Sequence, residues 1–160
     1  MLTGKASVLE TWWQDLTDAD RRRARASLEE VGCLGLADRS IGSCSSGERQ
    51  RVLIARALFG AHPLSLFDEP AAGLDLPARG WLLSAMTSAA TGPDAPTTVL
   101  ATHHLEEVPS TVTHAALLTA ARVVDQGPVE AVLSESALSR CYGLDIVLER
   151  RAGRWWARAR

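Results

Sequence analysis

A turn of small residues that opens a helix lies about twenty positions before an apolar strand that ends in two adjacent carboxylates. The turn lies within residues 44–51, and the strand with its carboxylates occupies residues 64–70. Unpaired backbone N–H groups at a helix N-terminus attract phosphate. Carboxylates at a strand end can hold Mg²⁺ or orient a water molecule. This pairing of a phosphate-attracting turn with carboxylates at a strand end indicates chemistry on a phosphate group.

Composition narrows the class of protein further. The 160 residues are 46% hydrophobic and 22% charged, with a formal net charge of −2 and a pI near 6.1. These values are ordinary for one globular domain and give no polyelectrolyte signal, so we expect no nucleic-acid partner. The three cysteines have no metal-ligand spacing, which favours reduced thiols in a cytoplasmic protein. Apolar runs stay shorter than the ~20 residues that span a bilayer, and the N-terminus lacks the apolar region of a signal peptide.

Local signals predict a helical section followed by alternating strands and helices, which is an α/β arrangement. Thr17 is placed to cap a first helix that Gly32 ends, and a second helix starts near Gly47. The expected strands are Leu64–Phe67, Thr97–Thr102, Val112–Leu118, Arg122–Asp125 and a terminal hairpin of Ile146–Glu149 with Arg154–Ala157. The expected later helices lie at 77–90, 104–108, 129–133 and 136–142. Since Leu64–Phe67 is almost entirely apolar, we expect both its faces to be covered.

The candidate phosphate contacts lie in the turn. Ser45 offers a hydroxyl, and Gly47 permits close approach of the backbone to a ligand. Taken alone, a serine-rich turn is more often a plain helix cap. The charged run that follows and the carboxylate-bearing strand favour the ligand-binding interpretation.

The candidate catalytic groups follow two strands. Asp68 and Glu69 end the first of them, and Gly73-Leu74-Asp75 comes a few residues later. His103 is the first residue after the Thr97–Thr102 strand. We expect the neighbouring His104 to be a surface residue, and Glu106 and Glu107 to lie on the exposed side of a short helix.

In this order and spacing, the motifs resemble those of an ATP-binding cassette (ABC) ATPase of the P-loop NTPase class. Residues 44–48 resemble the signature loop, although Cys44 stands for the usual Leu and Ser46 for the first Gly. The resemblance implies that ATP contacts Ser45, Ser46, Gly47, Glu48 and Asp75. It also implies that Asp68 holds Mg²⁺, that Glu69 is the general base and that His103 contacts the γ-phosphate. Asp68, Glu69, His103 and the turn at 45–47 are expected to converge around a terminal phosphoryl group.

The phosphate loop of this family, Gly-x-x-x-x-Gly-Lys-Ser/Thr, does not occur in these 160 residues. We therefore expect one incomplete domain, with a helical and signature portion (1–62) followed by the C-terminal half of the core sheet and a terminal β hairpin (63–160). Such a chain should expose an apolar sheet face. It should neither bind ATP tightly nor hydrolyse it alone, because losing even one oxyanion-type donor commonly costs ~10²–10³ in rate.

The resemblance implies an ATP-binding subunit of a transporter. Its partners would be a second ABC subunit, as a homo- or heterodimer, and an integral membrane permease at the inner face of the cell membrane. The closing segments and tryptophans resemble cassettes for molybdate or iron uptake. An alternative is a non-catalytic partner that supplies its signature loop to a complete cassette. DNA-repair ATPases share the motifs, but they need a long coiled coil, and no heptads occur here.

Overall fold

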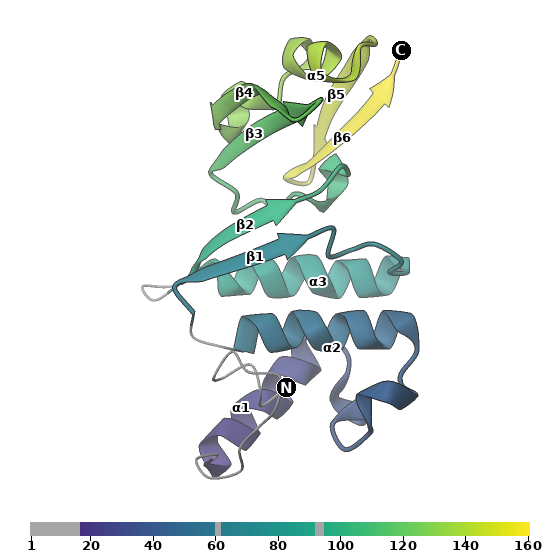
Figure 1. Cartoon of the computed structure of the whole chain (residues 1–160), viewed down its shortest axis with the longest axis vertical. Helices are drawn as coiled ribbons and strands as arrows, with labels where there is room; N and C mark the ends of the chain where they lie inside the picture. The colour runs from purple at the N-terminus through teal and green to yellow at the C-terminus, as the bar shows by residue number, and fades with distance from the viewer. Residues whose placement is uncertain (1–16, 60–61, 92–94) are drawn as a thin grey trace. The chain divides into compact units, whose positions relative to one another are not determined.

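The computed structural model describes residues 17–59, 62–91 and 95–160 (Figure 1). The chain forms two compact units, one reaching to Thr102 and the other beginning at His103. Each unit is described by itself. The sequence analysis divides the domain after residue 62, according to its motifs and not according to compactness. That division stays a prediction. The expected tryptophan-rich start at Trp12 and Trp13 lies outside the described residues.

The first helix, α1 (Asp18–Glu30), begins as its sequence predicts. The Thr17 hydroxyl oxygen accepts a hydrogen bond from the Asp20 amide, and the Asp20 carboxylate accepts one from the Thr17 amide at 3.0 Å. This reciprocal arrangement is a capping box, which satisfies two backbone donors that the helix itself leaves unpaired.

The end of α1 also matches its prediction. Gly32 adopts a φ of 66°, the Gly32 amide donates to the Glu29 carbonyl, and the Cys33 amide donates to the Leu28 carbonyl. These two bonds form a Schellman motif, which favours glycine at the left-handed position. A Cβ at Gly32 would lie 2.9 Å from ring atoms of Trp81, so the position also lacks room for a side chain.

The rest of the first unit places a parallel strand pair on two helices (Figure 1). The short 3-10 turns η2 (Leu34–Leu36) and η3 (Ile41–Ser43) lead to the helix α2 (Ser46–Phe59). Strand β1 (Leu64–Asp68), helix α3 (Leu76–Ala89) and strand β2 (Thr97–Ala101) follow. The register of the pair runs from Leu64 opposite Thr97 to Asp68 opposite Ala101. Carboxylates at the end of β1 are thereby placed at the carboxyl edge of the pair.

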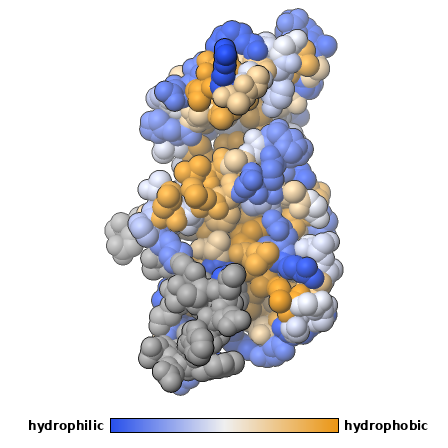
Figure 2. Space-filling model, viewed as in Figure 1, coloured by the Kyte–Doolittle hydropathy of each residue, from blue (hydrophilic) through white to orange (hydrophobic). Residues whose placement is uncertain are grey.

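The two faces of the β1–β2 pair differ. One face buries Phe67 against α2 and α3, in a core cluster of Ile54, Phe67, Ala71, Leu74, Ala78, Leu82 and Met86. On the other face, Leu64, Leu66 and Val99 are exposed, Leu66 by 69%. Figure 2 shows hydrophobic side chains at the surface over this pair. The expectation that β1 is covered on both faces is therefore wrong, and the expected exposed apolar face is present.

The second unit consists of two hairpins with short helices. Its elements are η4 (Leu105–Glu107), β3 (His114–Thr119), β4 (Arg122–Pro128), α4 (Val129–Val132), α5 (Glu135–Tyr142), β5 (Ile146–Arg151) and β6 (Arg154–Ala159). Strand β3 pairs antiparallel with β4, and β5 with β6, which confirms the predicted terminal hairpin. Val129, Leu133, Leu138 and Trp155 form the core of this unit.

Both hairpins turn through two residues with positive φ. The angles are 47° and 58° at Ala120 and Ala121, and 50° and 77° at Ala152 and Gly153. Two consecutive positive φ values give a type I′ turn, whose twist matches that of the flanking strands. Within the part of the chain that the structure describes, none of the helices is both long and apolar enough to cross a bilayer. The α/β class predicted from the sequence is confirmed.

Candidate functional site

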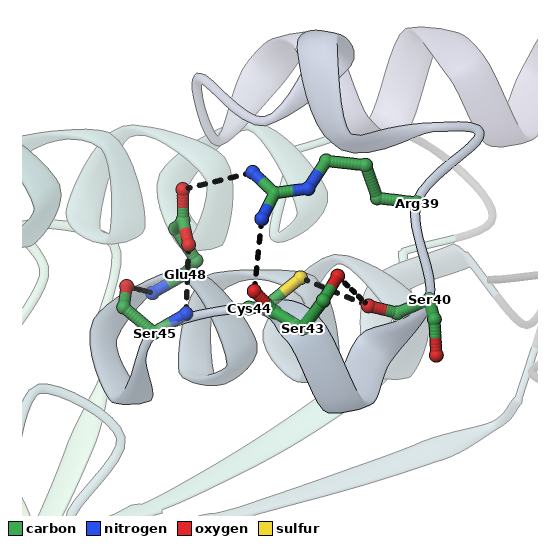
Figure 3. Close-up of polar contacts among 6 residues, drawn as sticks. All are labelled: Arg39, Ser40, Ser43, Cys44, Ser45 and Glu48. Carbon is green, nitrogen blue, oxygen red and sulfur yellow. Dashed lines mark hydrogen bonds and ion pairs between the residues drawn. The ribbon is translucent and has the colours of Figure 1, made fainter.

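The turn at the start of α2 is held by a reciprocal pair of hydrogen bonds (Figure 3). The Ser45 amide donates to the Glu48 carboxylate at 2.7 Å, and the Glu48 amide donates to the Ser45 hydroxyl oxygen at 3.3 Å. A hydroxyl that accepts one hydrogen bond keeps its own proton for donation. The arrangement therefore orients the Ser45 side chain and leaves its O–H able to donate to a ligand.

Glu48 is ionised at neutral pH. Its pKa lies below the ordinary value, chiefly because the Ser45 amide donates to the carboxylate, and then because of the Ser45 side-chain bond. The positive charges of Arg39 and Arg51 lower the pKa further, whereas burial acts in the opposite direction. The turn thus carries a fixed negative charge at its helix N-terminus.

Ser46 and Gly47 are the first two residues of α2, where backbone amides face outward from the helix start. A Cβ placed on Gly47 would meet no atom within 4 Å. The fold of this chain therefore does not itself require glycine at this position, and open space lies beside the turn. Such space is what a ligand approaching the backbone would use.

The carboxylate pair lies where β1 ends. Asp68 is its last residue and is exposed. The Glu69 amide donates to the Ala101 carbonyl at 2.9 Å, and Glu69 has a φ of 44°, a left-handed conformation that is uncommon for residues other than glycine, asparagine and aspartate. Backbone strain of this kind concentrates at functional sites. The pair is thus presented at the carboxyl edge of the strands, with Glu69 in a conformation that its local sequence does not favour.

One hydrogen bond joins the turn-bearing helix to this edge. The Gln50 side-chain amide donates to the carbonyl of Pro70 at 3.2 Å, and Pro70 directly follows Glu69. The second turn of the helix is therefore fastened to the segment that carries the carboxylates. Helix α2 and the segment that carries the carboxylates are therefore in direct contact, while convergence of the turn itself with the carboxylates around one phosphoryl group stays a prediction.

Asp75 has a structural role within this chain. Its carboxylate accepts a hydrogen bond from the Ala78 amide at 2.9 Å and caps the N-terminus of α3. Pro77 occupies the first turn of that helix, which begins one residue before the predicted range of 77–90. Contact of Asp75 with a nucleotide stays a prediction.

His103 is exposed and begins the second unit, whereas Asp68 and Glu69 belong to the first. Its approach to the carboxylates and to the turn therefore stays a prediction. The His103 and His104 rings lie 4.0 Å apart between centroids, and His104 Nδ1 is 3.6 Å from a carboxylate oxygen of Glu106. Glu107 is only 2% exposed, so the expectation that both glutamates lie on the surface is wrong for Glu107. It is buried because η4 packs against β6 rather than standing in solvent.

Mg²⁺ is compatible with the donors at the β1 edge. Over residues 17–59, 62–91 and 95–160, no three His, Cys, Asp or Glu side chains form a group that could hold a metal ion. Magnesium in nucleotide sites is usually held by one or two carboxylates, with water and phosphate oxygens completing its shell. An exposed carboxylate such as that of Asp68 fits this mode, in which the nucleotide brings most of the ligands.

Two residues of the site were missed by the sequence reasoning. Gln50 carries no local signal, because its partner is twenty positions away. Arg39 contacts the turn from the preceding segment (Figure 3). The Ser45–Glu48 bonds could have been anticipated, since Ser-x-x-Glu before an apolar run is the signature of a capping box.

Comparisons with known proteins show what the chain is similar to. A family model described as ABC transporter matches residues 2–72. An uncharacterised ABC transporter ATP-binding protein of Bacillus subtilis is 38% identical over 126 residues, which cover 79% of this chain and 48% of the relative. A zinc transport system ATP-binding protein of Treponema pallidum is 33% identical over 125 residues, which cover 78% of this chain and 46% of the relative.

The fold is also that of solved ABC transporter structures. One of them is a metal-chelate type ABC transporter in an inward-facing conformation. The match has a TM-score of 0.74 and 24% sequence identity, and it covers 98% of this chain and 62% of the transporter chain. The chain spans about half the length of the curated relatives it matches.

Proposed function

Because the chain belongs to the ABC transporter ATP-binding family, we propose that it forms the signature-bearing and carboxylate-bearing part of a transporter's ATP-binding subunit. In this role it couples ATP binding and hydrolysis to transport. The observation that carries the proposal is the Gln50–Pro70 bond, which links the helix that begins at the turn to the residue directly after the carboxylate pair. The phosphate loop comes from outside these 160 residues.

Each site residue has a distinct task in this proposal. Asp68 would hold Mg²⁺, which would supply positive charge to neutralise the phosphate. Glu69 takes a proton from the attacking water as general base, and His103 donates to the γ-phosphate. The left-handed backbone at Glu69 supports the assignment, since strain of this kind is kept where a side chain must point in one direction.

The turn serves ATP held by a second subunit. Ser45 donates its O–H to the terminal phosphate, while the amides of Ser46 and Gly47 add further donors. Glu48 holds the turn in place through its hydrogen bond with the Ser45 amide. Asp75 lies at the interface between the two subunits. Their capped and preorganised geometry supports this role, because donors set in place before binding cost no reorganisation.

The subunit docks on an integral membrane permease at the cytoplasmic face of the cell membrane. Its cargo is a metal cation or a metal chelate. This choice rests on the relatives, among them the zinc transport protein and a chelated iron transport protein of Yersinia pestis. The molybdate alternative that the sequence resemblance suggested has no such support among these relatives.

ATP hydrolysis by the reconstituted complex tests the proposal. The chain is purified alone and together with the proteins that co-purify with it, and phosphate release from MgATP is measured for both. We expect hydrolysis by the complex, a loss of at least ~10²-fold in Glu69→Gln, and no change in the exposed control Glu130→Gln. Hydrolysis by the isolated chain that Glu69→Gln abolishes would contradict the need for an outside phosphate loop.

A second candidate is a non-catalytic subunit that completes the site of an intact cassette. The preformed turn at Ser45 favours it, because this part of the site is structured within the chain itself. Here Ser45→Arg would abolish stimulation of the intact cassette, whereas Glu69→Gln would leave that stimulation unchanged. Loss in both variants instead supports the catalytic role.

A further inference from the structure

Arg39 spans the entrance of the turn at the start of α2. One terminal nitrogen of its guanidinium donates to the Ser43 carbonyl at 2.8 Å, and the other lies 3.9 Å from a carboxylate oxygen of Glu48 (Figure 3). These two contacts lie on either side of Ser45 in the sequence. The planar, forked guanidinium presents a separate terminal nitrogen to each partner, whereas an ammonium group has only one nitrogen to share between them.

The segment between Arg39 and the turn is itself compact. The Ser40 carbonyl accepts hydrogen bonds from the Ser43 amide and the Ser43 hydroxyl, and a weaker one from the Cys44 thiol at 3.6 Å. Cys44 is buried, so this segment has little freedom to move away from the helix. Arg39 adds a bond that closes it onto the first turn of α2.

Charge gives Arg39 a second effect. The Glu48 carboxylate suits the helix N-terminus, but it repels a phosphate that approaches the same amides. Arg39 carries the opposite charge and lies against that carboxylate. Arg51 also acts on Glu48 through its charge, but its guanidinium stacks on the Trp81 ring at 5.1 Å.

We propose that Arg39 is a positioning residue for phosphate binding at the Ser45–Gly47 turn: it closes the turn through Ser43 and offsets the charge of Glu48. The inference rests on the proposed function, in which this turn meets the terminal phosphate of ATP. It assigns Arg39 no direct contact with the nucleotide.

If Arg39 only formed an ordinary surface ion pair, its removal would have little effect on the turn or on phosphate binding, since exposed pairs contribute little to stability or binding. The nearby pair of Arg25 and Asp38, 3.6 Å apart, provides the matched control. Both arginines are exposed and belong to the same unit. Arg25→Gln removes the same charge without touching the turn.

The first measurement concerns the turn alone, without nucleotide. Hydrogen exchange of the Ser45 amide is followed by NMR in the full chain. We expect exchange to be about five- to tenfold faster in Arg39→Gln and in Arg39→Lys, and unchanged in Arg25→Gln, because only Arg39 closes the turn. Unchanged exchange in Arg39→Gln would overturn the closing role.

The second measurement uses inorganic phosphate as the probe and the amide shifts of Ser46 and Gly47 as the readout. Arg39→Gln is expected to raise the dissociation constant about fivefold, a change of about 1 kcal/mol. Arg39→Lys, which keeps the charge, should stay within about twofold of the wild type.

A double-mutant cycle decides whether charge balance is the cause. If Glu48→Gln is introduced first, Arg39→Gln should weaken phosphate binding less than it does in the wild type, because only the contact with the Ser43 carbonyl is then lost. Equal weakening with and without the Glu48 carboxylate would overturn the charge role. If phosphate leaves the Ser46 and Gly47 shifts of the wild type unchanged, the proposed function of the turn fails, and the exchange measurement distinguishes that result from a failure at Arg39.

Discussion

The side-chain amide of Gln50 donates a hydrogen bond to the main-chain carbonyl of Pro70, twenty positions away, at 3.2 Å. It fastens the second turn of α2 to the residue after Glu69. We therefore expect a shift of the Ser45 turn to strain the segment that holds the carboxylates, and a shift of that segment to strain the turn. This bond, together with the packing of Ile54 against Phe67 and Ala71, connects two segments whose contact the sequence order alone does not show.

Breaking that bond should cost stability. Gln50→Leu removes the donor and leaves the carbonyl of the buried Pro70 without this hydrogen bond, so we expect the free energy of unfolding to fall by about 1 kcal/mol. Gln50→Glu should cost more at neutral pH, because a carboxylate would face the carbonyl oxygen. Urea denaturation measures both. Gln126→Leu on the exposed strand β4 is the control, and an equal loss in that variant would contradict the assignment.

Asp75 offers a test of its capping role. Asp75→Ala removes the acceptor for the Ala78 amide and should lower the free energy of unfolding by about 1 kcal/mol, whereas Asp75→Asn keeps an acceptor and should cost much less. Thermal or urea denaturation compares them. Similar losses in the two variants would show that the cap is not what stabilises α3.

Acid should weaken the turn through Glu48. Its pKa is lower in the folded chain than in the unfolded chain, where an ordinary value near 4.3 applies. The unfolded state therefore binds more protons in this range, so the stabilisation is complete above the unfolded pKa and is lost as pH falls through the folded one. We expect stability to drop more steeply below about pH 4.3 in the wild type than in Glu48→Gln. Parallel pH profiles in urea denaturation would contradict this.

The alternation along β1 predicts opposite effects for neighbouring residues. Leu66→Lys on the exposed face should leave the free energy of unfolding nearly unchanged and should reduce self-association and dye binding to exposed apolar surface. Phe67→Ala on the core face should cost about 3–5 kcal/mol. Sedimentation and denaturation together check the pair. A large loss of stability in Leu66→Lys would place the core on the wrong face.

The β3–β4 turn can be improved. Ala120 and Ala121 both hold positive φ values, which alanine adopts at a cost. Ala120→Asn with Ala121→Gly supplies the residues that a type I′ turn favours and should raise the free energy of unfolding of this unit by about 1 kcal/mol. Hydrogen exchange of β3 and β4 amides measures it. No slowing of exchange would contradict the turn assignment.

Local signals in the sequence were sufficient for most element boundaries. Thr17 with Asp20 predicts the start of α1, Gly32 its end and Pro77 the first turn of α3, because each depends on backbone needs within a few residues. The burial of Ile54 is not indicated by such local signals, since it depends on packing against Phe67 of a neighbouring strand.

The sequence indicated which residues could form the candidate site, but not how those residues are organised. Motif resemblance singled out Ser45, Asp68 and Glu69, yet the left-handed backbone of Glu69 and the Gln50–Pro70 bond arise from tertiary contacts. The exposure of one face of β1 also differs from the expectation that both faces are covered. An apolar run shows that a strand can be buried on both faces, but it does not show which elements are present to cover them.

The parallel pairing of β1 and β2 has a consequence for how the chain acquires its structure. Partners in that pair lie more than thirty positions apart, as in Leu64 with Thr97, whereas the hairpins join strands across two residues. Loop-closure entropy must be overcome before distant partners meet, so low contact order favours early formation of the C-terminal hairpins. During synthesis and refolding, the segment that carries the carboxylates should be the last to reach its final register.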